Sequence, residues 1–210
     1  RVNYGQVLQA SLLISDEKLN IKSKHEMRCR LKPTVIPAIG ACMVHKIPVD
    51  LLKKANRSHY QMVLEHYNLI KQNTPAIVMG FNQVAFDLEF YRRMLFKSLI
   101  PEVYQTNTNG NSHLDILNVV RVSKFADDDA IKTILNEKNR TSFRLSDLCI
   151  ANNIDNGENH DAITDCLNSI DLAKIIMKKT SKIWNDALLL TTKKDTENFI
   201  LKNKVYTSLE

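Results

Sequence analysis

An α/β fold is predicted by the order in which apolar segments occur along the chain. Residues 76–81 form a short apolar run that is typical of a buried strand, and residues 84–99 repeat apolar side chains at helical spacing directly after it. A strand that leads into a helix is the repeating unit of α/β proteins, in which sites form at the carboxyl end of the strand. The 210 residues are enough for one domain with a substantial core.

Two further strands are predicted near the start of the chain. Residues 7–14 are almost continuously apolar and end at Ser15 and Asp16, as a buried strand followed by a turn would. Residues 21–32 alternate between mostly uncharged and mostly charged side chains, which indicates one covered and one solvated face. The charged, basic face fits contact with a phosphate backbone. It fits equally well an edge strand that its charges protect from pairing with other chains.

The middle of the chain is predicted to contain a loop, a helix and a short strand. Three prolines and Gly40 fall within residues 33–48, which predicts a loop. Ser58 is a suitable N-cap for a helix that continues to about Gln72. Residues 114–117 have the composition of a short strand.

The second half of the chain is predicted to be mainly helical. Residues 127–140 are polar and poorly patterned, which indicates a solvated loop. A short helix is predicted for residues 142–154, and a longer one for residues 160–190 with a break near Thr180. The Lys-rich tail, residues 191–210, has little core signal and is interpreted as a linker.

The composition favours a polyanionic partner and a reducing compartment. The net charge is +6 and the isoelectric point is near 9.1, which favours nucleic acid or another polyanion. The four cysteines show no C-x-x-C spacing, so they are interpreted as reduced core residues, not as disulfides or zinc ligands. No apolar run has the length of a membrane span and the first residues do not resemble a signal peptide. We therefore expect a cytoplasmic protein without a membrane contact.

His160 and Asp165 are candidates for chemistry because they bring a titratable base and a carboxylate to the start of one helix. Five residues on a helix correspond to roughly 140° of rotation and about 7.5 Å of rise, so the two side chains cannot chelate one ion together. The spacing does allow Asp165 to hold a metal ion while His160 reaches a water beside that ion. The simpler interpretation is that His160 is a cap or surface residue and that Asp161 only complements the helix dipole.

Four blocks of the sequence resemble bacterial exodeoxyribonuclease I in their order and spacing. They are residues 80–89 (GFNQVAFDLE), 114–121 (LDILNVVR), 142–145 (SFRL) and 160–165 (HDAITD). The resemblance covers most of the chain, from about residue 3 to residue 190. That family belongs to the DEDDh class of 3'-5' exonucleases, so the resemblance implies a ribonuclease H-like exonuclease domain with a mixed β-sheet flanked by helices.

The activity that the resemblance implies is hydrolysis of single-stranded DNA to mononucleotides. In the family, four carboxylates hold two Mg²⁺ or Mn²⁺ ions that activate water and stabilise the leaving oxygen. The resemblance assigns Asp87 and Asp165 to the metal ions and His160 to the general base. Further positions carried over by the resemblance are neighbours of the 3'-terminal nucleotide, namely Asn82, Phe86 and Arg144.

The first motif of the family, an Asp-x-Glu on a strand ahead of residue 7, has no counterpart at that position. Asp87-Leu88-Glu89 has this pattern, but it begins a predicted helix and already matches the second motif. Glu89, like Asp115, is expected either to have a structural role or to support the residues that hold the metal ions. We therefore expect residues 1–190 to be an exonuclease domain truncated at its N-terminus, with residues 191–210 leading towards absent accessory domains. The isolated chain is expected to bind divalent ions weakly.

Two other functions remain open from the sequence. One keeps the fold and the chemistry but changes the substrate, either to RNA ends or to mispaired ends in a proofreading role. The other is a non-catalytic nucleic-acid-binding domain that has lost the first motif naturally, which the net charge of +6 fits equally well. Protein partners are not indicated.

Overall fold

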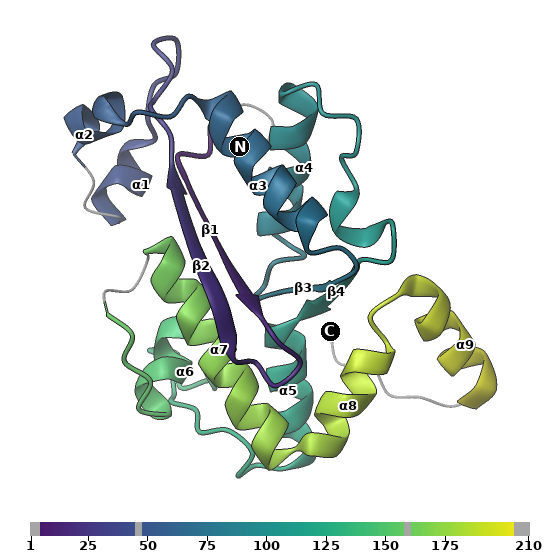
Figure 1. Ribbon diagram of the computed structural model, residues 1–210. Coiled ribbons are helices and arrows are strands. Elements are labelled where there is room, and N and C mark those ends of the chain that lie inside the picture. Colours follow the sequence, from purple (N-terminus) through teal and green to yellow (C-terminus); the bar gives the residue numbers. More distant parts are fainter. Residues whose placement is uncertain (1–4, 45–47, 158–160, 204–210) are drawn as a thin grey trace. The chain divides into compact units, whose positions relative to one another are not determined.

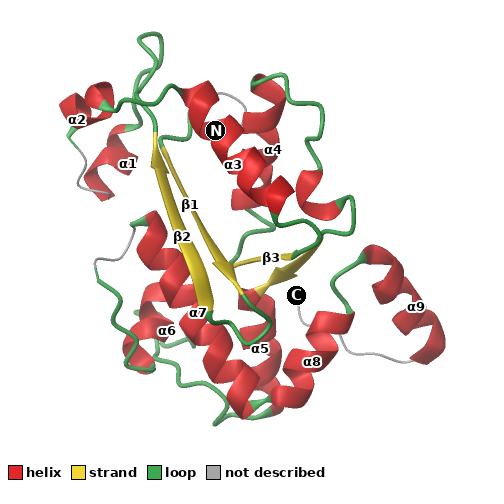
Figure 2. Cartoon of the chain, viewed as in Figure 1, coloured by secondary structure: helices red, strands yellow, loops and turns green. Residues whose placement is uncertain are grey.

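The computed structural model describes residues 5–44, 48–157 and 161–203. The chain forms two compact units, each of which combines a two-stranded sheet with helices, as an α/β class requires (Figure 2). The first unit contains Arg1–Thr74, Ala85–Gln105 and Gly157–Cys166, and the second contains Pro75–Val84, Thr106–Asn156 and Leu167–Glu210.

A β-hairpin is the sheet of the first unit. Strands β1 (Gln9–Ser15) and β2 (Ile21–Arg28) run antiparallel, side by side (Figure 1). The Asp16 carboxylate accepts hydrogen bonds from the backbone N–H groups of Lys18 and Asn20, both at 2.9 Å, and so closes the turn. Covered and exposed side chains alternate along β2, which confirms the predicted two-faced strand.

Two helices complete the core of the first unit. Helix α3 (His59–Gln72) begins at Ser58, as predicted, and Ser58 and Gln61 form a reciprocal capping box. Helix α4 (Asp87–Lys97) packs against α3. The core of this unit consists of Met27, Cys29, Met62, Val63, Tyr67, Ile70, Tyr91, Met94, Leu95 and Ile100.

The predicted loop at residues 33–48 contains a helix that the sequence pattern did not indicate. Helix α1 (Ile39–Val44) and helix α2 (Val49–Lys54) have six residues each. Pro48 is the residue before α2, where its fixed φ suits a helix start and its missing N–H costs nothing. Helices this short give too few turns for an apolar period to be visible in the sequence.

The second unit is built on a parallel pair of strands. Strands β3 (Ile77–Gly80) and β4 (Ser112–Asp115) pair in parallel, and β4 passes directly into helix α5 (Ile116–Ala126). The strand predicted at residues 114–117 is therefore corrected: it starts earlier, and its last two residues begin a helix. The change of structure occurs at Asp115, whose side chain caps α5 by accepting from the backbone N–H of Leu117 at 3.1 Å.

The remaining helices follow the predicted order. They are α6 (Leu145–Ala151), α7 (Ala162–Lys179), α8 (Ser181–Leu189) and α9 (Lys193–Asn203). The predicted break at Thr180 is confirmed, because α7 ends just before it and α8 begins just after it. The segment predicted as a linker contains α9, which buries no residue. Nowhere in the described ranges does a helix combine the length and the apolar character that crossing a bilayer demands.

Candidate active site

Asp87 is the first residue of α4, and its side chain is exposed. The free backbone N–H groups of a helix N-terminus favour a carboxylate at this position. Glu89, two residues later, pairs with Arg93 at 2.9 Å and lies 4.0 Å from Arg92. Its contacts are those of a structural residue, as the sequence led us to expect.

Asp165 lies in the first turn of α7. Its backbone N–H donates to the carbonyl of Asp161 at 2.9 Å, so the helix begins at Ala162. The predicted helix start is therefore two residues too early. His160, the predicted general base, lies outside the described residues.

Asp87, Asp161 and Asp165 lie within range of Cys166 for their charges to act on its thiol. Burial raises the pKa of the Cys166 thiol to about 12, and the charges of Asp165, Asp87 and Asp161 add to the increase because they disfavour a nearby thiolate. The thiol donates to the carbonyl of Ser11 on β1 at 3.8 Å. Carboxylates from two distant segments of the chain therefore influence one half-buried thiol, without forming a group of three that converges on a single metal position in the described residues.

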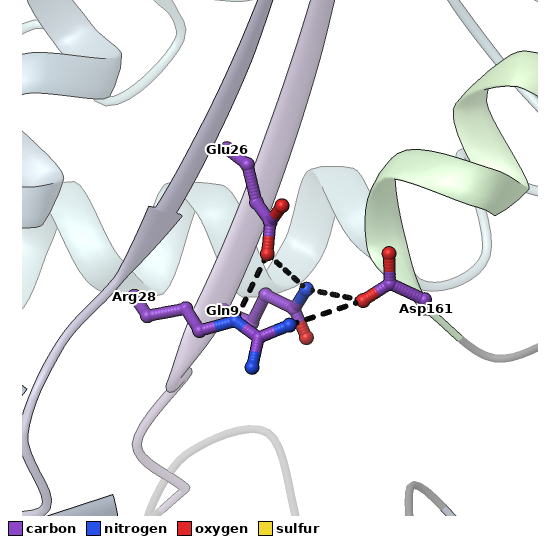
Figure 3. Close-up of polar contacts among 4 residues, drawn as sticks. All are labelled: Gln9, Glu26, Arg28 and Asp161. Atoms are coloured by element: carbon purple, nitrogen blue, oxygen red, sulfur yellow. Dashed lines mark hydrogen bonds and ion pairs between the residues drawn. The ribbon is translucent and has the colours of Figure 1, made fainter.

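Asp161 differs from the other two carboxylates because the β-hairpin holds it (Figure 3). The Gln9 side-chain amide donates to Asp161 Oδ1 at 2.8 Å, and Arg28 Nη2 contacts the same oxygen at 3.2 Å. Gln9 and Arg28 are paired neighbours on β1 and β2. Glu26 accepts from both of them, at 3.0 and 2.9 Å, and so orients the two donors.

The consequence of this arrangement is that Asp161 is tied to the hairpin. The charge of Asp161 is balanced by Arg28, and its oxygen already accepts two hydrogen bonds. It fixes the start of α7 to the hairpin and is poorly suited to be a metal ligand. This agrees with the sequence, where Asp161 was not assigned to a metal ion.

The carboxyl end of β3 is shaped by Gln83 and Asp115. The buried Gln83 side chain donates to the carbonyls of Val78 at 2.8 Å and Leu114 at 3.1 Å, and so joins the ends of the two strands. A Cβ atom on Gly80 would lie 2.9 Å from this side chain, so Gly80 leaves room for it. Sequence reasoning did not single out Gln83, although a Gly-x-x-Gln pattern after a strand was visible.

Asp115 binds three backbone N–H groups with one carboxylate. It accepts from Asn82 at 2.8 Å, Val84 at 3.1 Å and Leu117 at 3.1 Å. The first two bonds hold the turn after β3, in which Asn82 has a φ of 58°. The structural role predicted for Asp115 is therefore that of a turn and cap residue.

Asp115→Ala is expected to lower the free energy of unfolding of the second unit by about 3 kcal/mol. Each backbone donor that loses its partner costs about 1–3 kcal/mol, and hydrogen bonds to water recover part of the total. Urea denaturation followed by circular dichroism measures the change. Asp115→Asn keeps an acceptor oxygen in place and should lose less than half as much. Equal losses in the two variants would contradict the three-bond role.

The three predicted nucleotide neighbours lie on turns and helix starts. Phe86 precedes α4 in the first unit and is 57% exposed, and its ring is tilted against that of Phe90 at 4.7 Å between centroids. Asn82 and Arg144 belong to the second unit, and both side chains are exposed. Arg144 precedes α6, and its backbone N–H donates to Ser142 Oγ at 3.4 Å.

Asp87 and Asp165 are the right type of ligand for a hard divalent cation, but two carboxylates are too few for a complete site. Asp87 and Asp165 supply the carboxylate oxygens that Mg²⁺ and Mn²⁺ prefer. Within residues 5–44, 48–157 and 161–203, however, no group of three His, Cys, Asp or Glu side chains converges on one metal position.

A second Asp-x-Glu triplet does not replace the first motif. Asp195-Thr196-Glu197 lies in α9 rather than on a strand. The Thr192 hydroxyl donates to the Asp195 carboxylate, and Glu197 lies 3.5 Å from Lys193. These contacts stabilise the first turns of α9.

Comparisons with known proteins agree on one group of relatives. No family model matches the chain. The chain is 31% identical to exodeoxyribonuclease I of Haemophilus influenzae over 172 residues, which cover 82% of this chain and 36% of that protein. It is 28% identical to exodeoxyribonuclease I of Buchnera aphidicola from Acyrthosiphon pisum over 178 residues, or 84% of this chain and 43% of the relative.

Solved structures show the same fold. The exonuclease I structure from Methylocaldum szegediense matches with a TM-score of 0.87 and 22% identity over 96% of this chain and 43% of its own. Escherichia coli exonuclease I in complex with a dA16 oligonucleotide matches with a TM-score of 0.87 and 21% identity over 94% of this chain and 42% of its own. The chain thus spans about two-fifths of the length of the proteins it matches. In sequence and in fold, this chain is related to bacterial exodeoxyribonuclease I.

Proposed function

We propose that this chain is part of a metal-dependent 3'-5' exonuclease that degrades single-stranded DNA to mononucleotides. The observation that carries the proposal is that the charges of Asp87 and Asp165 both act on the Cys166 thiol, which places the two carboxylates in one neighbourhood of the first unit. The two carboxylates come from the first turns of two different helices, α4 and α7. Relatives of the chain are named exodeoxyribonuclease I, and one structure with its fold is a complex with a DNA oligonucleotide.

The residues of the chain have distinct roles in this proposal. Asp87 and Asp165 hold divalent cations, Mg²⁺ or Mn²⁺, which would supply an activated water and stabilise the leaving oxygen. His160 would act as the general base that takes a proton from water. Phe86, exposed beside Asp87, offers a ring face to the terminal base, as stacking platforms for single strands do.

Asn82 and Arg144 contact the terminal nucleotide in this proposal. Both side chains are exposed, which leaves their polar groups available to a ligand. Four free cysteines are typical of a reducing compartment, so the proposal includes a cytoplasmic location.

The complete metal site needs more carboxylates than Asp87 and Asp165. We propose that an Asp-x-Glu strand completes it, because the sequence offers no such motif on a strand and the described residues form no three-ligand group. Two carboxylates alone hold Mg²⁺ weakly, since this ion exchanges its water reluctantly.

The test compares two proteins on the same substrates. One is the 210-residue chain, and the other is the same chain with the first-motif strand of a relative fused ahead of it. Each protein is incubated with Mg²⁺ and with 5'-labelled DNA or RNA oligonucleotides. We expect stepwise shortening of DNA from the 3' end by the fused protein, faster than of RNA, and little by the chain alone.

Other outcomes decide between the alternatives. Binding of DNA without shortening in both proteins would favour the non-catalytic domain. Faster shortening of RNA would favour the RNA-directed enzyme, because the 2'-hydroxyl is the group that distinguishes the two substrates at a site.

A further inference from the structure

A second site candidate lies in the first unit, around the N-terminus of α3. A pocket of about 220 Å³ opens there between the segment after β2, the first residues of α3 and the end of α4. Polar and aromatic side chains that line it are Arg30, Lys32, Ser58, His59, Tyr60 and Lys97. No Asp or Glu lines it.

The basic side chains of this pocket have no counter-charge. Lys97 Nζ donates to the carbonyl of Gly5 at 3.0 Å, and Arg30 Nη1 donates to the carbonyl of Asn56 at 3.4 Å. In the part of the chain that the structure describes, neither these two residues nor Lys32 forms an ion pair with a carboxylate within 4.0 Å. The pocket therefore concentrates positive charge that an anion would neutralise.

The start of α3 adds oriented donors. Ser58 and Gln61 satisfy each other in the capping box, at 2.8 and 3.2 Å. His59 and Tyr60 lie between these two residues, at the start of the 14-residue helix. Their backbone N–H groups have no partner among the described residues. No acidic residue lies in the first turn to compensate the positive end of the helix dipole.

His59 adds a hydrogen-bonding side chain to the lining of the pocket. Its side chain is buried, with the residue 6% exposed, and lines the pocket without a hydrogen-bond partner in the described part of the chain. Burial and then the charges of Lys32 and Lys97 lower its pKa to about 4, so the ring is neutral at physiological pH. The ring nitrogens of His59 are not among the fully buried polar atoms that lack a partner, so they remain accessible from the pocket, where an oxyanion could accept the ring N–H.

The chemistry of the rim points to a nucleotide as the source of the anion. Tyr60 is 53% exposed at the edge of the pocket, where its ring can stack on a base. We propose that this pocket binds the phosphate group of a nucleotide, with Arg30, Lys32 and Lys97 around the phosphate and Tyr60 against the base.

This site is separate from the candidate active site. Asp87 is the first residue of α4 and Lys97 its last, so ten residue steps of about 1.5 Å place them about 15 Å apart along the helix axis. Binding in the pocket therefore requires neither the metal ions nor the activity proposed above, and it can be tested on the 210-residue chain alone.

In the experiment, the chain in EDTA is titrated separately with thymidine 5'-phosphate, with inorganic phosphate and with thymidine. Calorimetry measures the binding affinity, and the NMR signals of the His59 ring report its protonation. We expect the phosphate of the nucleotide to offset the two lysine charges and to raise the pKa of His59 by about one unit. The combined variant Lys32→Gln, Lys97→Gln should weaken nucleotide binding at least tenfold.

A matched variant controls for net charge. Lys24→Gln removes an exposed charge on β2, six residues and so about 20 Å of strand from Arg30, and should leave nucleotide binding unchanged. Equal weakening by Lys24→Gln, or an unchanged His59 signal at saturation, would overturn the proposal. Equal affinities for inorganic phosphate and the nucleotide would overturn the role of the base and leave a free-phosphate site.

Discussion

In the protein completed with a first-motif strand, Asp165→Asn is expected to lower the rate of Mg²⁺-dependent 3'-end hydrolysis by about a hundredfold or more. The reason is that removing even a residue that only supports a metal ligand lowers metal affinity or activity by about 10–100-fold. The substitution keeps the shape of the side chain and removes the charge that would hold the cation. Single-turnover hydrolysis of 5'-labelled DNA measures the rate, and Mn²⁺ titration measures the affinity in parallel.

Asp171→Asn is the matched control for this prediction. Asp171 lies on the same helix, where it pairs with Lys174 at 3.0 Å and accepts from Asn156 at 2.9 Å. This variant should keep the rate within about threefold, since an exposed ion pair contributes only about 0–1 kcal/mol. Equal rates for the two variants would refute the assignment of Asp165 to the metal site.

The elements that the sequence predicted well are those whose local signals are complete. α3 has both a capping residue and several turns of apolar period, and the break between α7 and α8 falls at Thr180, as predicted. α5 was missed because its first two residues, Ile116 and Leu117, are apolar and were included in the strand predicted at residues 114–117. The Asp115 side chain decides between strand and helix, through a cap that periodicity does not report.

The candidate site was predictable in part for the same kind of reason. Asp87 and Asp165 belong to continuous blocks that resemble a known family, so they could be named from the sequence. Gln9 and Arg28 could not, because their contacts with Asp161 join residues 152 and 133 positions apart. Such contacts depend on the register of the hairpin, in which Gln9 faces Arg28, and on where α7 begins.

Acidification is expected to destabilise the first unit between pH 6.5 and about pH 4. Burial lowers the pKa of His66 to about 4, and burial with the charges of Lys32 and Lys97 does the same for His59. Above pH 6.5 both histidines are neutral in the folded and unfolded states, so they do not affect stability. Between pH 6.5 and 4 only the unfolded state binds the protons, so stability falls as the pH falls. His66 contributes a loss of up to about 3 kcal/mol, at about 1.4 kcal/mol for each pKa unit, and His59 contributes less because solvent reaches its ring from the pocket.

His66→Phe separates this effect from a general loss of packing. The His66 ring is tilted against Tyr91 at 4.9 Å between centroids, and its Nδ1 atom is buried without a partner among the described residues, so a phenyl ring fits the chemistry of the site. Urea denaturation at pH 8 and pH 4.5 should show a smaller difference in the variant, by about 2 kcal/mol, because it has no proton to bind. Tyr67→Phe, on the same helix, loses the hydrogen bond from Lys71 at 3.3 Å but keeps both histidines. It should shift both measurements equally, and an unchanged pH dependence in His66→Phe would show that His66 is protonated in the folded state.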